Sequence, residues 1–217
     1  MTVDELMAKR LGAGREYRKF NANDLVIRDK KGDDDAMFVE GYASTFNEPY
    51  ELFRVPGYTV NEQIDPRAFD ECDMSDVIMQ YDHEGRVFAR KSNHTLEVNP
   101  DERGLFIRAD LSGTEIGRQL YSEIKGGYTT KMSFGFVVDT DTRLIEEDKE
   151  TGAVTVLRTI TKIRKLYDVS AVSLPANDAT EISARNLGDG LIKEITEERR
   201  QRAKAKLQLK LKLMEVK

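Results

Sequence analysis

The sequence predicts a mainly β protein, either a β-barrel or a curled antiparallel sheet with a few helices around it. Several short segments rich in aromatic and β-branched residues are separated by turn residues, which is typical of strands. Helical periodicity is confined to a few stretches. The 217 residues contain no internal repeat and no glycine-rich phosphate loop.

Seven strands are expected in chain order. Asn47-Glu48-Pro49 ends the first of them, and Pro175 closes the last. An acidic hairpin around residues 139–152 joins the fifth strand to the sixth. The expected strands cover residues 38–46, 77–81, 95–98, 105–111, 130–138, 154–163 and 166–174.

Helices are expected at two places within this pattern. Asp65 can cap a helix and Pro66 fits its first position, which predicts one or two helical turns over residues 66–72. Thr114 caps a longer helix over residues 115–125, where apolar residues recur every four positions, and a glycine pair follows.

Charge and composition divide the chain into three parts. Residues 1–34 are polar and predict an N-terminal arm, with a short helix at its start. Residues 35–186 form the expected main domain, and residues 187–217 form a basic tail. Residues 193–217 hold nine Lys or Arg against four Glu. Strong helix formers predict a helix from about residue 190, although residues 206–213 alternate like a strand.

Composition also argues against several classes of protein. The net charge of −5 argues against nucleic acid as the main partner. No apolar run approaches the roughly 18 residues that a membrane span needs. Cys72 is the single cysteine, so an internal disulfide is excluded, and its acidic neighbours make it a poor nucleophile. No Cys/His spacing suggests a metal, and no cofactor is expected.

Histidine is scarce, and this restricts the choice of a general base. Only His83 and His94 are present. If the chain performs hydrolysis without a metal, one of them must accept the proton. His83 follows an apolar strand and precedes a turn, where its ring could face a cleft; the alternative is an ordinary surface histidine bonded to its acidic neighbours.

The strand over residues 130–138 carries a candidate nucleophile. Side chains alternate along a strand, so Phe134 and Phe136 face the core while Ser133 and Gly135 share the opposite face. A glycine beside a serine leaves room for another backbone to approach. An ordinary solvent-facing serine is the alternative.

Asp168 interrupts an otherwise apolar strand and therefore needs a partner, because an unpaired buried carboxylate costs several kcal/mol. Lys131 or Arg164 could serve as that partner, and so could an imidazole N–H. In the second case Asp168 would orient a catalytic histidine, and His83, Ser133 and Asp168 would supply base, nucleophile and orienting group.

An ordered set of short motifs resembles a known family, the prohead (capsid maturation) proteases of tailed bacteriophages, whose fold is related to the herpesvirus assembly proteases. The motifs are VEGYASTFN at residues 39–47, AFD at 68–70, YDH at 81–83, GL at 104–105, MSFGF at 132–136 and DVSAVSLPAN at 168–177. The resemblance covers about residues 36–182.

The resemblance implies a serine endopeptidase with His83 as base and Ser133 as nucleophile. It implies action inside the viral procapsid, in the bacterial cytoplasm, on scaffold and major capsid protein and on the protease itself as a further candidate. A homo-oligomer is expected, with no membrane partner.

Two positions depart from the family pattern. Arg67 stands where a glycine is frequent, and Asp168 stands where a glutamate is frequent. The herpesvirus relatives use a second histidine as third member, and His94 is the candidate for that role, although it precedes Ser133. Backbone oxyanion donors leave no trace in a sequence and stay unassigned.

In two rival interpretations the chain is not an enzyme. It could be a scaffold or assembly-chaperone protein that keeps the protease fold without catalysis. It could also be a capsid-interaction module with a helical oligomerisation tail over residues 188–217.

Overall fold

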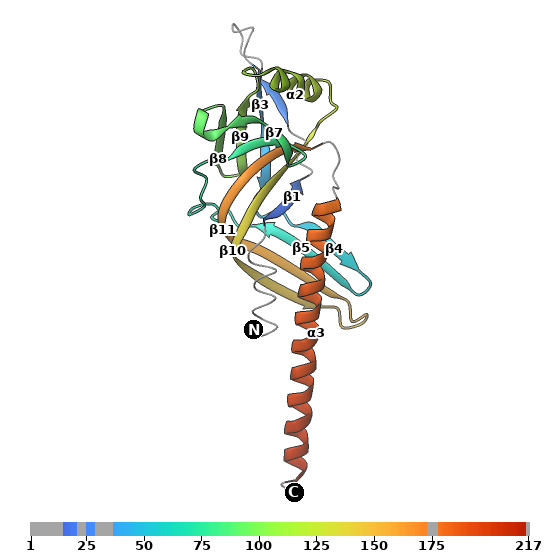
Figure 1. The fold of residues 1–217 in the computed structure, drawn as a ribbon. Coiled ribbons are helices and arrows are strands. Elements are labelled where there is room, and N and C mark those ends of the chain that lie inside the picture. Colours follow the sequence, from blue (N-terminus) through green and yellow to red (C-terminus); the bar gives the residue numbers. More distant parts are fainter. Residues whose placement is uncertain (1–14, 21–24, 29–36, 173–177, 216–217) are drawn as a thin grey trace.

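The computed structural model describes residues 15–20, 25–28, 37–172 and 178–215 (Figure 1). The strands are β1 (Glu16–Phe20), β2 (Val26–Arg28), β3 (Phe38–Thr45), β4 (Tyr50–Val55), β5 (Tyr58–Ile64), β6 (Ile78–Tyr81), β7 (Glu84–Arg90), β8 (Leu96–Pro100), β9 (Gly104–Asp110), β10 (Lys131–Glu147) and β11 (Val154–Val172). The helices are the short 3₁₀ helix η1 (Lys91–Asn93), α2 (Glu115–Lys125) and α3 (Asp178–Glu215).

The strands form two open sheets, so the barrel alternative is wrong for the described residues. The larger sheet has the order β1-β10-β11-β5-β4, with β6 paired to β11 and β7 paired to β6. The smaller sheet has the order β2-β3-β9-β8. The larger sheet is mixed because β11 pairs in parallel with β5 near its start and with β6 near its end. Both parallel partners lie beside one long strand, and within the described residues β1, β4 and β7 are edge strands of the sheet.

The hairpin of β10 and β11 is the backbone of the larger sheet. Its strands are 17 and 19 residues long, so the two strands expected over 154–163 and 166–174 are one strand, and the strand expected over 130–138 runs on to Glu147. Bulges shift the register between Gly135 and Asp141, where the alternation suggested a strand end. Residues 173 and 174 of the prediction lie outside the described residues.

The hydrophobic core lies between the sheets and under α2. Phe134 stacks on Phe136 with ring centroids 4.4 Å apart, and Phe69 packs against Phe134. Strand β10, which carries the two stacked rings and Ser133, is therefore anchored by buried aromatic side chains on its core face.

Helix α2 agrees with its prediction. The Thr114 hydroxyl accepts a hydrogen bond from the Gly117 N–H at 3.0 Å, and Leu120 and Ile124 are buried on one face. The predicted helical turns over residues 66–72 are wrong. That segment is a series of turns in which backbone bonds span three residues, such as Ala68 N–H to the Asp65 carbonyl.

Part of the expected N-terminal arm belongs to the sheets. β1 pairs antiparallel with β10 along residues 132–136, and β2 pairs with β3. The helix expected at the start of the arm lies outside the described residues. The division into arm, main domain and tail remains a prediction.

Helix α3 begins beside the larger sheet and extends well beyond it (Figure 1). The helix includes residues 206–213, so helix propensity prevails over their alternating pattern. Ile195 is buried against Val60, Val154 and Val156. No helix among the described residues is both long and apolar enough to cross a bilayer.

Candidate active site

Three side chains from three separate elements form one hydrogen-bonded chain. His83 Nδ1 lies 2.5 Å from Asp168 Oδ1, and His83 Nε2 lies 2.6 Å from Ser133 Oγ. Ser133 and Asp168 are fully buried, and the His83 side chain is 7% exposed. The residues that the sequence suggested as base, nucleophile and orienting group therefore lie together.

A tight hairpin aims the histidine. Asp82 and His83 form the two-residue turn between β6 and β7, and both have positive φ, of 48° and 62°. Positive φ at both central residues is the feature of the type I′ turn, which matches the twist of a hairpin. The parallel pairing of β6 with β11 brings the turn next to Asp168, and Asp82 N–H donates to the Ala171 carbonyl at 3.0 Å.

The Asp168 carboxylate is held by more than the histidine. The Ser170 hydroxyl donates to Asp168 Oδ1 at 2.9 Å from the same face of β11. Arg15 Nη1 lies 3.7 Å from Oδ2, which makes no hydrogen bond within the described residues. Among the described contacts, the imidazole and the Ser170 hydroxyl are thus the hydrogen-bond partners of Asp168, and Arg15 is the cation beside it, rather than Lys131 or Arg164 as considered from the sequence.

Gly135 makes room for this arrangement. A Cβ on Gly135 would lie 2.3 Å from Asp168 Oδ2 and 2.8 Å from Tyr17 Cε1, both far inside van der Waals contact. The face expected to be open beside Ser133 is instead buried, because a carboxylate and an aromatic ring fill the space that Gly135 leaves.

Strand β1 lies directly against the three residues. The Ser133 hydroxyl donates to the Arg18 carbonyl oxygen at 2.8 Å. The Tyr17 ring packs on the His83 ring with centroids 4.4 Å apart. These contacts bury the serine under the N-terminal strand.

The chain of contacts can activate a hydroxyl. A carboxylate that accepts the Nδ1 proton holds the imidazole in the tautomer whose Nε2 can take a proton from serine. Removal of that proton turns a weak nucleophile into an alkoxide-like one. Ser133 Oγ can donate its single proton either to His83 Nε2 or to the Arg18 carbonyl oxygen, so these two acceptors compete.

The other candidates lie elsewhere. His94 is exposed, ends η1 with a φ of 63°, and bonds neither Ser133 nor Asp168 among the described contacts. Burial raises the pKa of Cys72 to about 11, which leaves the thiol protonated and unreactive near neutral pH. No group of three or more His, Cys, Asp or Glu within the described ranges could hold a metal.

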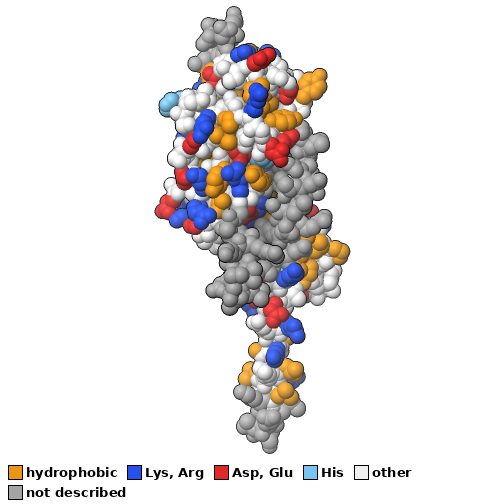
Figure 2. Space-filling model, in the orientation of Figure 1, with side chains coloured by type: hydrophobic (Ala, Val, Ile, Leu, Met, Phe, Trp, Pro, Cys, Tyr) orange, Lys and Arg blue, Asp and Glu red, His pale blue; other side chains and the backbone are white. Residues whose placement is uncertain are grey.

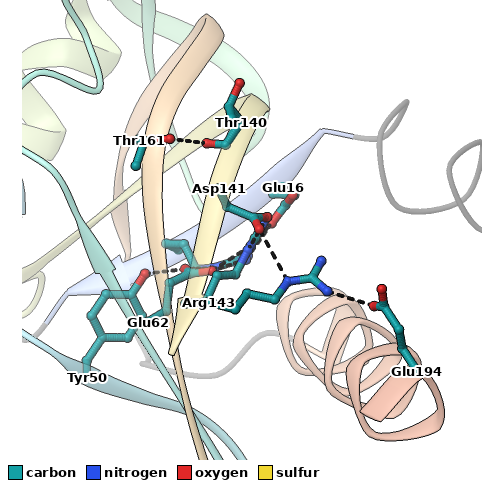
Figure 3. Close-up of polar contacts among 10 residues, drawn as sticks. Glu16, Tyr50, Glu62, Thr140, Asp141, Arg143, Thr161 and Glu194 are labelled. Carbon is teal, nitrogen blue, oxygen red and sulfur yellow. Dashed lines mark hydrogen bonds and ion pairs between the residues drawn. The ribbon is translucent and has the colours of Figure 1, made fainter. Parts of the chain in front are cut away.

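A buried charge cluster links β1 to β5, β10 and β11 of the larger sheet (Figure 3). Arg18 Nε is 2.5 Å from Glu62 Oε1, and Arg158 Nη1 is 2.6 Å from Glu62 Oε2. Glu16 and Asp141 complete the pairs of the two arginines.

Glu62 is the centre of the cluster and also accepts a hydrogen bond from the Tyr50 hydroxyl. Burial by itself would raise the pKa of Glu62, but the charges of Arg18 and Arg158 outweigh burial and lower this pKa to about 2. The carboxylate therefore stays ionised in the folded protein.

Three residues at the site were not found from the sequence. Ser170 could have been, because it lies two positions after Asp168 and so shares its face. Tyr17 and Arg15 belong to the segment interpreted as an arm, and only the pairing of β1 with β10 brings them to the site.

The chain is similar to known proteins at the level of family and of structure. The model of the caudovirus prohead serine proteases matches residues 23–191. No significant match to a curated protein sequence was found. Among solved structures, the capsid assembly protease gp21 of bacteriophage T4 is similar, with a TM-score of 0.45 and 12% identity, over 74% of this chain and 98% of that one. The family match spans every strand of both sheets except β1 and includes all three site residues, and the chain belongs to the caudovirus prohead serine protease family.

Proposed function

We propose that this chain is a serine endopeptidase of capsid maturation, with Ser133 as nucleophile, His83 as general base and Asp168 as orienting group. The observation that carries the proposal is the continuous contact from Asp168 through His83 to Ser133. Family membership supplies the biological setting, a phage prohead.

The proposed reaction has two halves. Ser133 Oγ attacks the scissile carbonyl carbon while its proton passes to His83 Nε2, and the Asp168 carboxylate stabilises the imidazolium. His83 then returns the proton to the leaving amine, which breaks the C–N bond and leaves an acyl ester on Ser133. Water, deprotonated by His83, cleaves the ester and restores the serine.

The substrates that we propose are the major capsid protein and the scaffold of the same phage, and the chain itself as a further one. We also propose action by a homo-oligomer inside the procapsid, in the bacterial cytoplasm. Kinship with the herpesvirus assembly protease fold is part of the same proposal.

A non-catalytic scaffold protein is the rival function. A structural protein has no need for a buried serine, imidazole and carboxylate in hydrogen-bond contact, because each buried polar group costs free energy unless it is paired. Their pairing in catalytic order therefore favours the enzyme.

The decisive experiment is co-expression of the chain with the major capsid protein, followed by intact mass measurement. The wild-type chain should shorten the capsid protein, and Ser133→Ala should leave it full length. Equal shortening by the Ser133→Ala variant would reject Ser133 as nucleophile. Ser122→Ala, at an exposed position of α2, is the matched control and should process normally.

A further inference from the structure

Strand β1 pairs with the edge of β10, the strand that carries Ser133, that β11 does not cover. It pairs antiparallel with β10 over five residues, with Lys19 opposite Ser133 and Tyr17 opposite Gly135. The other edge of β10 is covered by β11, so the edge under β1 is the one that remains for an incoming peptide backbone. An extended peptide that adds to a sheet edge is a common mode of peptide recognition.

The two faces of β1 have different contacts. Tyr17 lies on the face of Gly135 and covers the His83 ring. Arg18 points to the opposite face, where its side chain enters the charge cluster with Glu62. Tyr17 therefore covers the site, while the ion pair of Arg18 with Glu62 holds β1 in place on the opposite face of the sheet.

The backbone of β1 meets Ser133 in a non-productive way. The Ser133 hydroxyl donates its proton to the Arg18 carbonyl oxygen. In acyl transfer the oxygen of the attacked carbonyl must point toward oxyanion donors, and the serine proton must point toward the base. The contact with Arg18 thus diverts the proton that His83 would take.

The charge cluster permits β1 to leave. β1 contributes one anion, Glu16, and one cation, Arg18, so its departure leaves the net charge of the cluster unchanged. Glu62 would keep Arg158 and the Tyr50 hydroxyl, and Arg158 would keep Asp141. No charge of the sheet would be stranded without a partner, which is the condition that makes loss of a buried pair costly.

We propose that β1 is an internal occupant of the substrate-binding edge of β10, that it keeps the peptidase latent, and that substrate replaces it as an extended strand. The inference rests on the proposed function, since it concerns access to Ser133. It explains how a protease with an assembled site is prevented from cutting until its N-terminal strand withdraws.

The test measures access to Ser133 in the full-length chain with a fluorophosphonate probe. The probe forms a bond between phosphorus and Ser133 Oγ and releases fluoride, so intact mass reports the labelled fraction over time. Arg18→Ala removes the fastening side chain but keeps the carbonyl and Tyr17. Its labelling rate should exceed the wild-type rate by at least about tenfold, because β1 loses charge-assisted hydrogen bonds to the sheet, and one such bond is worth about one decade or more.

Two further variants keep the test decisive. Glu16→Gln weakens the hold of β1 while every charge of the sheet keeps a partner, so it should label faster than wild type even if Arg18→Ala folds poorly. Arg54→Ala is the matched control, because Arg54 is an exposed arginine of the same sheet, paired with Glu51 rather than with β1. It should label at the wild-type rate.

A synthetic peptide of residues 15–20 provides an independent arm. Added in excess to the Arg18→Ala chain, the peptide should slow labelling by binding to the edge of β10 that β1 has left.

If the wild type and both β1 variants were labelled at the same measurable rate, β1 would not keep the peptidase latent, but the proposed function would stand. Absence of labelling in every folded variant would instead reject Ser133 as an activated nucleophile. A fragment that ends at Arg18 would make β1 a substrate and overturn its non-productive role.

Discussion

At the scale of single residues, the contacts that position the proposed triad can be tested through Ser170. Its hydroxyl donates to Asp168 Oδ1, the oxygen that also contacts His83. Ser170→Ala removes that bond and leaves Asp168 freer to turn, so we expect processing of the capsid protein to slow by about tenfold, the effect of losing a hydrogen bond to a charged group. Equal processing rates for Ser170→Ala and wild type would show that Ser170 does not support Asp168.

Asp168→Asn should slow processing of the capsid protein by about three to four orders of magnitude, because an amide fixes the wrong tautomer of His83.

Cys72 offers a test that separates serine from cysteine chemistry. Burial raises the pKa of its thiol to about 11, so the thiolate is scarce near neutral pH. We expect iodoacetamide to modify the folded chain far more slowly at pH 7.5 than the urea-unfolded chain. Cys72→Ala should process the capsid protein at the wild-type rate, and loss of processing in this variant would contradict the serine mechanism.

At the scale of elements, β10 shows how closely the backbone and the site are coupled. A Cβ at position 135 would meet both the Asp168 carboxylate and the Tyr17 ring. Gly135→Ala should therefore reduce processing by at least about a hundredfold, because small displacements of catalytic groups have effects of that size. Gly113→Ala is the control, since a Cβ there meets nothing within 4 Å, and it should leave processing and thermal unfolding unchanged.

The elements that the sequence predicted and the ones that it did not differ in a physical way. Helix α2 carries its own periodicity and cap, so local pattern was sufficient there. The pattern located the β10–β11 hairpin but not the full length of its strands, because bulges interrupt the alternation. β1 was missed because five residues, three of them charged, have no apolar alternation. Its extended form depends on pairing with a distant strand and on Glu62, and no local pattern reports either contact.

The candidate site was predictable for a different reason. Each of its three residues interrupts the pattern around it: a rare histidine at a turn, a serine beside a glycine, and a carboxylate in an apolar strand. Their convergence depends on the parallel pairing of β6 with β11, which links segments about 90 residues apart. Sequence patterns therefore identified the groups, while the mixed sheet brings them together.

At the scale of the whole molecule, the charge cluster predicts how stability depends on pH. The folded-state pKa of Glu62 is about 2, below its ordinary value of 4.5, so its ionised form stabilises the fold. That stabilisation is complete above about pH 4.5 and is lost as pH falls from there toward 2. Urea unfolding between pH 6 and pH 2.5 should show this decline.

Glu62→Gln provides the comparison for that measurement. It should lower the unfolding free energy by about 1.5–3 kcal/mol at pH 7, because two buried guanidinium groups lose the carboxylate that they share while Glu16 and Asp141 still pair with them. The variant should also show a shallower decline in acid than wild type. Parallel stability profiles for the two proteins would contradict the role assigned to the cluster.

The last prediction concerns α3, whose two halves have different surroundings. The proximal part is fastened to the larger sheet by buried Ile195 and by ion pairs from Arg143 to Glu194 and from Arg199 to Glu147. The distal part is exposed, and Figure 2 shows hydrophobic side chains among the basic ones along it; Leu207, Leu209 and Leu211 are 53–61% exposed. Because Leu residues at every second position spread around a helix, they form no single apolar face.

Two truncations separate these halves. Removal of the residues after Ala203 should leave the thermal midpoint within about 1 °C of the full chain, because the side chains that the structure describes there, at residues 204–211, are all exposed. Truncation after Asn186 removes Ile195 and both ion pairs and uncovers Val60, Val154 and Val156, so it should lower the midpoint by several degrees. Thermal unfolding of the three chains at equal concentration gives the comparison. If the full chain and the chain that ends at Asn186 had equal midpoints, the proximal part of α3 would add nothing to the stability of the sheet beneath it.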